Sequence, residues 1–296
     1  MNKLGIFMNF WEKNWDADHC KYIRKASAIG YDILEFQAQP LLEMSDEKLR
    51  TLKACAADNG IELTYSMGLD PRYDLASMDE SVRLGGVEYM KRILEQIHKM
   101  DGQVLSGVNY AGWGIPAGFI DDKRPQWEQS LKSMRSILKT AEDYDISYAL
   151  EVVNRFEGFL LNTAAEALDY VAELDSKKVG ILLDTYHMNI EEASMGDAIH
   201  SVGDKLIGFH TGENNRTAPG KGHLDWDEIF GALSDIGYRH RIVSEPFVVM
   251  GGEVGRDIHV YRNLIDRTDE ARIDEEAKYL LNFERSMLQK YGMENN

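Results

Sequence analysis

The sequence predicts a (β/α)8 barrel, the fold of TIM barrels, on three observations. Eight short apolar runs with strand character recur along the 296 residues, and amphipathic helical stretches separate them. No GxGxxG motif follows the first run, as it would in a doubly wound nucleotide-binding sheet. No linker or shift of composition divides the chain, so we expect one domain spanning 1–296.

The expected strands follow one another at a regular interval. They cover 4–10, 31–37, 61–68, 103–109, 147–153, 179–187, 205–212 and 241–248. A doubly wound open sheet is the main alternative, because alternation of strands and helices does not by itself prove closure. The count of eight strands favours the closed barrel.

Helical periodicity fills the intervals between these runs. One helix face is formed by Val87, Met90, Leu94 and Ile97. A last helix, at about 272–291, has an apolar stripe suited to covering the barrel after strand eight. The stripe consists of Ile273, Ala277, Leu280, Leu281, Leu288 and Tyr291.

Several helix starts carry capping residues. Ser45 is an expected N-cap, and Thr163 with Glu166 has the spacing of a capping box, in which each residue's side chain accepts from the other's backbone N–H. Asp225 with Glu228 repeats that spacing. These signals place helix starts directly after the expected strands and loops.

Two long loops follow strands and contain several glycines. They cover 110–125 and 211–225. In an α/β barrel the loops after the strands build the active-site face, so we expect the functional site there.

The charge balance limits the classes of partner. The chain has 33 Lys+Arg against 50 Asp+Glu, a net charge of -17, which would repel nucleic acid and anionic membranes. A small neutral ligand suits this balance better. Cys20 and Cys55 lack CxxC spacing, and the chain has neither a signal-peptide pattern nor a run of 18 apolar residues. We therefore expect reduced thiols in a soluble cytoplasmic protein.

Four acidic or imidazole side chains end the last four apolar runs. Glu151, Asp184, His210 and Glu245 lie where strands five to eight give way to loops. A charged group in a buried strand is costly unless it is compensated, and one divalent cation could compensate all four. Three carboxylates and one imidazole suit manganese, cobalt or magnesium, and the ligands alone do not choose among them. The alternative is four separate salt bridges.

A metal held in this way suits proton abstraction from a sugar. It would bind a carbonyl and the neighbouring hydroxyl and acidify the hydrogen on the carbon between them. Glu151 and Glu245 come from strands three apart, so they could approach a substrate from different faces. One glutamate would remove the proton and the other would return it, which inverts the carbon.

At these residues the chain resembles the ketose 3-epimerase family, the D-tagatose and D-allulose (psicose) 3-epimerases, within the xylose isomerase-like barrels. The motifs LEVVNRFE, LLDTYHMNIEE, FHTGENNR, PGKG and EPF carry the resemblance, which extends over nearly the whole chain. It implies one divalent ion, usually manganese or cobalt, on Glu151, Asp184, His210 and Glu245, with Glu151 and Glu245 as the acid/base pair. It also implies a homodimer or homotetramer acting on a free ketose.

The same resemblance implies further substrate contacts. Glu157, His187 and Arg216 would contact the carbonyl end of the ketose. Walls of the pocket are expected from Phe7, Ser66, Trp113 and Phe247. Ser66, the loop around Trp113 and Ser244 depart from commoner family sequences, and we expect all three to border the far end of the sugar.

Other functions share parts of this pattern. A sugar-phosphate epimerase would use Lys221 and Arg216 to bind phosphate, and an aldose–ketose isomerase would move the proton between carbons 1 and 2. A metal-dependent endonuclease would need more site histidines and a basic face. A sugar-binding protein with a structural metal is the non-enzymatic alternative.

Overall fold

The computed structural model describes residues 2–114 and 120–294, and its eight strands form a closed parallel barrel in chain order. The strands are β1 Leu4–Phe7, β2 Ile33–Gln37, β3 Glu62–Ser66, β4 Val104–Leu105, β5 Ser147–Val152, β6 Val179–Asp184, β7 Leu206–Thr211 and β8 Arg241–Ser244. The barrel closes where β1 pairs with β8, for example Gly5 with Val243. This confirms the predicted fold and rules out the open sheet.

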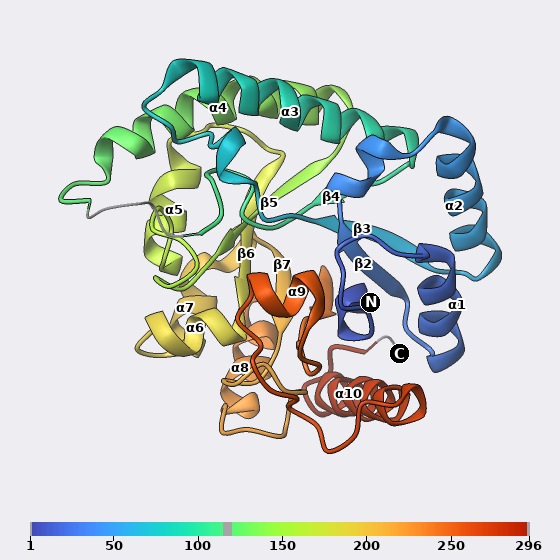
Figure 1. Cartoon of the computed structure of the whole chain (residues 1–296). Helices are drawn as coiled ribbons and strands as arrows, with labels where there is room; N and C mark the ends of the chain where they lie inside the picture. The colour runs from blue at the N-terminus through green and yellow to red at the C-terminus, as the bar shows by residue number, and fades with distance from the viewer. Residues whose placement is uncertain (1, 115–119, 295–296) are drawn as a thin grey trace.

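Most helices surround the barrel on its outer side (Figure 1). The helices are α1 His19–Ile29, α2 Asp46–Asp58, α3 Glu80–Lys99, α4 Arg124–Asp143, α5 Ala164–Ala172, α6 Thr185–Glu191, α7 Met195–Val202, α8 Trp226–Asp235, α9 Gly252–Asp257 and α10 Glu270–Lys290. The short α9 is drawn over the middle of the barrel in Figure 1. No helix in 2–114 or 120–294 is long and apolar enough to cross a membrane.

Some predicted strands are longer than the observed ones. The run at 4–10 ends as a strand at Phe7 and continues as a short 3-10 helix, Met8–Phe10. Residues 185–187, predicted as strand, instead begin α6, and the Asp184 side chain caps that helix by accepting from the Tyr186 backbone N–H at 2.6 Å. Apolar periodicity alone does not locate such a strand end, because a buried helix start has the same composition.

The predicted N-caps are observed, but the capping boxes are not. Thr163 accepts from the backbone N–H of Glu166, and Asp225 accepts from that of Glu228. The Glu166 carboxylate, however, accepts from Asn162 N at 2.8 Å, one residue before the cap, and the Glu228 carboxylate reaches α7. The reciprocal hydrogen bond is therefore replaced by a neighbouring backbone N–H at Glu166 and by a tertiary contact at Glu228.

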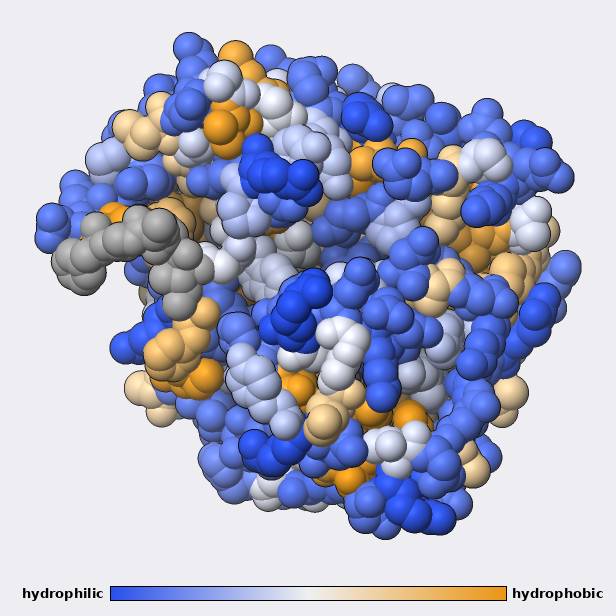
Figure 2. All heavy atoms as spheres, in the orientation of Figure 1, coloured by the Kyte–Doolittle hydropathy of each residue, from blue (hydrophilic) through white to orange (hydrophobic). Residues whose placement is uncertain are grey.

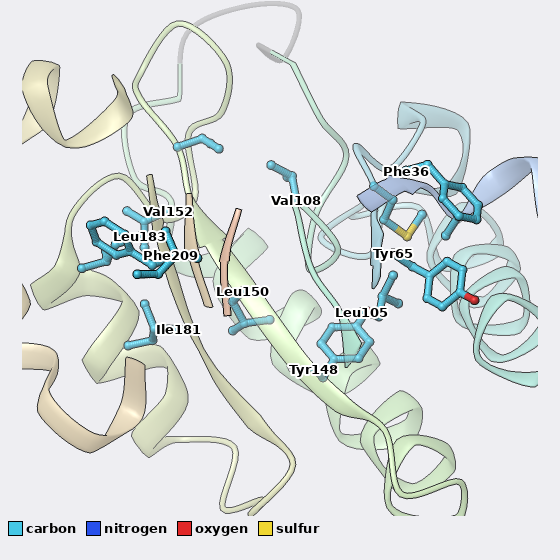
Figure 3. Packing of buried hydrophobic residues seen from close by; sticks show 14 of the residues in the cluster. Phe36, Tyr65, Leu105, Val108, Tyr148, Leu150, Val152, Ile181, Leu183 and Phe209 are labelled. Carbon is cyan, nitrogen blue, oxygen red and sulfur yellow. The ribbon is translucent and has the colours of Figure 1, made fainter. Parts of the chain in front are cut away.

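Side chains alternate along each strand between the hydrophobic core under the helices and the functional site inside the barrel. Leu150 and Val152 in β5, Leu183 in β6 and Phe209 in β7 belong to the buried hydrophobic cluster (Figure 3). Successive side chains of a strand point to opposite faces. The residue next to each of these core side chains therefore points into the barrel. The buried runs thus both anchor the helices and aim Glu151, Asp184 and His210 inward.

The outer surface agrees with the acidic composition. Figure 2 shows a mostly hydrophilic face on which hydrophobic residues form small, separate patches. Cys20 in α1 and Cys55 in α2 are free thiols, as predicted.

The last helix is tied to the site-bearing strands by a buried carboxyl group. Glu284 of α10 is fully buried, and its Oε1 accepts from Thr211 Oγ1 at 2.5 Å and from Ser244 Oγ at 2.9 Å. These two residues lie next to His210 and Glu245 in the chain. Burial raises the pKa of Glu284 to about 8, although both hydroxyl donors oppose the rise.

This raised pKa predicts a pH-dependent stability. The folded protein keeps the Glu284 proton up to about pH 8, whereas the unfolded chain loses it near pH 4.5. Stability from this group is therefore present below pH 4.5 and declines as pH rises to about 8, by about 1.4 kcal/mol per pKa unit. In Glu284→Gln, which has no proton to lose, we expect a smaller fall of the melting temperature between pH 5 and pH 8 than in the wild type. Parallel melting curves for the two proteins would contradict this account.

Candidate active site

Four buried side chains from neighbouring strands meet at the C-terminal mouth of the barrel. Glu151 lies in β5, Asp184 ends β6, His210 lies in β7 and Glu245 directly follows β8. One ligand atom from each lies within 4.8 Å of the others. The register brings them together, since Asp184 pairs with His210, and the Glu245 backbone N–H donates to Thr211 O at 2.9 Å.

The geometry of this cluster fits a single cation. His210 Nδ1 is buried and has no hydrogen-bond partner within the described residues. It lies 3.6 Å from Glu151 Oε1 and 3.8 Å from Glu245 Oε2. Ligand atoms about 2.0–2.3 Å from a shared ion are separated by about 3–4.5 Å, and both of these His210 distances fall in that range. The far side of the ring, Nε2, lies 2.9 Å from Glu35 Oε1, where a carboxylate can orient a metal-binding histidine.

The local electrostatics also favour a cation. Burial raises the pKa of Glu151 to about 7 and that of Asp184 to about 6, and the nearby Glu245 carboxylate adds to both shifts. For His210, burial alone would lower the pKa, but Glu35 and Glu245 outweigh it and hold the pKa well above its ordinary value. For Glu245, burial alone would raise the pKa, but His210 and Arg216 outweigh it and lower the pKa instead. A cluster that holds protons on Glu151, Asp184 and His210 would be stabilised by a divalent cation in their place.

Arg216 extends over the carboxylates from the loop after β7. Its Nη1 donates to Glu245 Oε2 at 3.1 Å and to Asp184 Oδ2 at 3.4 Å. The guanidinium also lies 4.0 Å from the centre of the Tyr186 ring and 5.2 Å from that of Phe247. The side chain is thus held by both charge and aromatic contact at one edge of the ligand cluster.

The loop conformation that presents Arg216 is stabilised from within. Arg216 has a φ of +64°, in the left-handed region, at a tight turn where its N–H donates to Glu213 O at 2.9 Å. The buried Glu213 carboxylate accepts from Gly220 N at 2.8 Å and from Trp226 Nε1 at 2.7 Å. These bonds offset the strain of the turn.

A cavity opens beside the ligand cluster. Its polar side carries two of the cluster glutamates and the three side chains for which substrate contact was predicted, namely Glu151, Glu245, Glu157, His187 and Arg216. Its other walls include Ser66, Trp113 and Phe247, again at predicted positions. The remainder of the predicted loop, 115–119, lies outside the described residues.

Three residues that the sequence had placed in a substrate or phosphate site do not line this cavity. Phe7 packs behind Phe247, with ring centres 5.9 Å apart, and does not line the cavity. Ser244 points outward to Glu284, because it precedes the inward-facing Glu245 in the chain. Lys221, the candidate phosphate ligand, forms an ion pair with Glu276 of α10 instead. The expectation that Ser244 borders the far end of the sugar is therefore wrong.

Other site residues had not been singled out from the sequence. Glu35 carries the same signal as the four cluster residues, a charged residue in an apolar strand. Trp15 and Ile258 line the cavity from segments with no strand-end signal. They reach the mouth because the ends of β1 and β8, which precede them, are neighbours in the barrel.

Comparisons with known proteins show the family of this chain. Residues 23–282 match the xylose isomerase-like TIM barrel family. The D-psicose 3-epimerase of Ruminiclostridium cellulolyticum is 43% identical over 287 residues, covering 97% of this chain and 98% of its own. That of Agrobacterium fabrum is 41% identical and covers 97% and 99%. The ketose 3-epimerase of Arthrobacter globiformis is 32% identical over 89% of this chain and 88% of its own.

Solved structures show the same relationship. The D-psicose 3-epimerase from Clostridium cellulolyticum, described with D-tagatose, has a TM-score of 0.94 and 43% identity, covering 97% of this chain and 99% of its own. A D-psicose 3-epimerase described in the presence of D-fructose also has a TM-score of 0.94, with 41% identity and coverage of 97% and 99%. On sequence and fold together, the chain is an epimerase of the isomerase class and belongs to the ketose 3-epimerases of the xylose isomerase-like TIM barrel family.

Proposed function

We propose that this chain interconverts free ketoses at carbon 3 and that Glu151 and Glu245 move the proton. The observation that carries the proposal is the placement of two buried glutamates in one ligand cluster at a cavity that both line. A divalent ion on Glu151, Asp184, His210 and Glu245, manganese or cobalt before magnesium, would polarise the substrate oxygens and stabilise the negative charge that develops on them.

The protein's own groups account for the rest of the reaction. One glutamate takes the proton from carbon 3, and the electron pair of the broken C–H bond forms the double bond of a cis-enediolate. The other glutamate gives a proton to the opposite face of carbon 3, so the centre is inverted. Arg216, His187 and Glu157 line the same cavity and supply hydrogen-bonding groups for the carbonyl end of the substrate.

The test is an incubation of the purified protein in D2O with D-fructose, D-psicose (allulose), D-tagatose and ribulose. We expect the epimeric ketose with one deuterium at carbon 3, detected by NMR. An aldose product would assign the chain to aldose–ketose isomerisation instead. The D-fructose/D-psicose pair is the first to measure, because the two relatives at 43% and 41% identity are named D-psicose 3-epimerases.

Substrate preference is expected to depend on the wall formed by Trp113. Gly68 faces this indole so closely that a Cβ at residue 68 would lie 2.8 Å from two of its ring carbons. In Gly68→Ala the indole must therefore shift, and we expect a several-fold rise of KM for the ketose with a smaller change of kcat. Gly85→Ala is the matched control, because a Cβ there meets nothing within 4 Å. Equal KM values for the two variants would contradict a role for the Trp113 position in binding.

Three other predictions accompany the proposed activity. They are a single catalytic domain spanning 1–296, a cytoplasmic location, and a homodimer or homotetramer. Light scattering of the purified protein measures the last of these, with a mass of about two or four times 33.7 kDa expected.

A further inference from the structure

Asn154 makes two contacts with one nitrogen of His187. Asn154 lies just beyond β5 and is 1% exposed. Its backbone N lies 3.2 Å from His187 Nδ1, and its side-chain Nδ2 lies 2.7 Å from the same atom. No substrate or metal is needed to form this arrangement, because both residues belong to the protein's own framework.

These contacts fix which ring nitrogen carries the proton. A backbone N–H can only donate, so His187 Nδ1 must accept and cannot be protonated. The Asn154 amide agrees, because its Oδ1 already accepts from Phe156 N at 2.9 Å, which leaves Nδ2 as the group facing the ring. An imidazole with an acceptor at Nδ1 is neutral and carries its proton on Nε2. Burial, with the charge of Arg216, also lowers the pKa of His187 well below its ordinary value.

The protonated nitrogen faces the cavity. His187 Nε2 lies 3.4 Å from Arg216 Nη2 and 3.9 Å from Glu151 Oε1. Arg216 can only donate, so its contact with Nε2 would be a hydrogen bond only in the opposite tautomer. The two shorter contacts at Nδ1 decide against that tautomer. His187 and Arg216 therefore present two donors side by side, a pair that suits one oxygen atom of a ligand.

We propose that Asn154 is a positioning residue that holds His187 in the Nε2-protonated tautomer, so that His187 offers a neutral N–H donor to a substrate oxygen. The identity of that oxygen, on the reacting end of a ketose, rests on the proposed function; the tautomer does not. The proton stays on His187 throughout, and the donor stabilises charge that develops on the oxygen during proton abstraction.

The decisive variant is Asn154→Asp. A carboxylate in place of the side-chain amide, which lies 2.7 Å from Nδ1, cannot donate and would accept a proton there. This shorter, charged contact outweighs the backbone N–H at 3.2 Å, so the tautomer reverses and an unprotonated Nε2 faces the substrate. Asn154→Ala is the matched control, because it removes the side chain and keeps the backbone N–H. We expect kcat to fall about 100-fold in Asn154→Asp, as when one donor to a developing oxyanion is lost, and by less in Asn154→Ala. KM should change less than kcat in both.

The tautomer itself is read from 15N NMR of histidine-labelled protein loaded with Mg²⁺, which is diamagnetic. His187 is assigned by the signal missing in His187→Gln. We expect an unprotonated Nδ1 in the wild type and in Asn154→Ala, and a protonated Nδ1 in Asn154→Asp. A protonated Nδ1 in the wild type would overturn the proposal, as would an unchanged kcat in Asn154→Asp with a reversed tautomer. If Asn154→Asp does not fold, the wild-type and Asn154→Ala spectra still decide. If the spectra are as expected but the protein epimerises no ketose, the proposed function is refuted and the tautomer assignment stands.

Discussion

Replacing either Glu151 or Glu245 by glutamine is expected to lower kcat for ketose epimerisation by about 10²–10⁴-fold, the usual contribution of a positioned acid or base. Both side chains are buried and line the cavity, and glutamine keeps their size while removing the ability to take a proton. The exposed Glu275 of α10 provides a matched control, and Glu275→Gln should retain wild-type turnover. Near-normal rates in both site variants would rule out the two-base mechanism.

Isotope exchange separates the roles of the two glutamates. With two bases on opposite faces, each epimer gives its proton to a different glutamate. In D2O, each variant should therefore exchange the carbon-3 hydrogen of only one epimer, the one whose proton faces the glutamate that remains, and should form almost no inverted product. Loss of exchange for both epimers in both variants, with the divalent ion still bound, would instead indicate that neither glutamate can act alone.

Removing the metal is expected to have the second-largest effect. A chelator should lower activity by more than about 100-fold, since the ion's stabilisation of developing charge is worth several kcal/mol, and adding Mn²⁺ or Co²⁺ should restore it. The ion should also stabilise the fold, by about 2.7 kcal/mol at a concentration 100 times its Kd. The measurements are turnover and melting temperature before and after reconstitution. Full activity in protein shown by elemental analysis to contain no metal would refute the metal's role.

Asp184, the proposed ligand with no proposed part in proton transfer, gives the matched variant. Asp184 is fully buried in the cluster but does not line the cavity. Asp184→Asn should therefore weaken metal binding, measured by calorimetry, and excess metal should recover part of the turnover. Excess metal should not rescue Glu151→Gln in the same way, because that variant lacks a base as well as a ligand.

The cluster of Glu151, Asp184, His210 and Glu245 could be predicted from sequence because burial leaves few explanations for charge in an apolar strand. Glu151, Asp184 and His210 each follow a run of core residues, and strand periodicity then requires the charged side chain to face the barrel interior. Glu35 had the same signal but lies in β2, three strands before the first strand of the cluster, β5. Its partner, His210 of β7, is 175 residues distant, and only closure of the barrel brings the two together.

Local patterns were less informative where tertiary contacts compete with them. Ser244 precedes a ligand and was assigned to the pocket, yet it faces Glu284, which lies 40 residues later in α10. Phe7 is an aromatic residue of the kind that lines sugar pockets, but it packs against the ring of Phe247 instead. A side chain one position from a functional residue in a strand points to the opposite face, so nearness in sequence does not imply nearness to the substrate.

The sequence by itself determined the barrel and the four charged or imidazole side chains that meet at its mouth, two of them glutamates from different strands, since these depend on periodicity and on the cost of buried charge. Only the tertiary structure decided the arrangement around them: Glu35 behind His210, Arg216 over two of the carboxylates, and Asn154 at Nδ1 of His187. Hydrogen-bond direction and tautomer depend on distances of about 3 Å between groups far apart in the chain. No local pattern encodes those distances, because they are set by how the strands close and the loops pack.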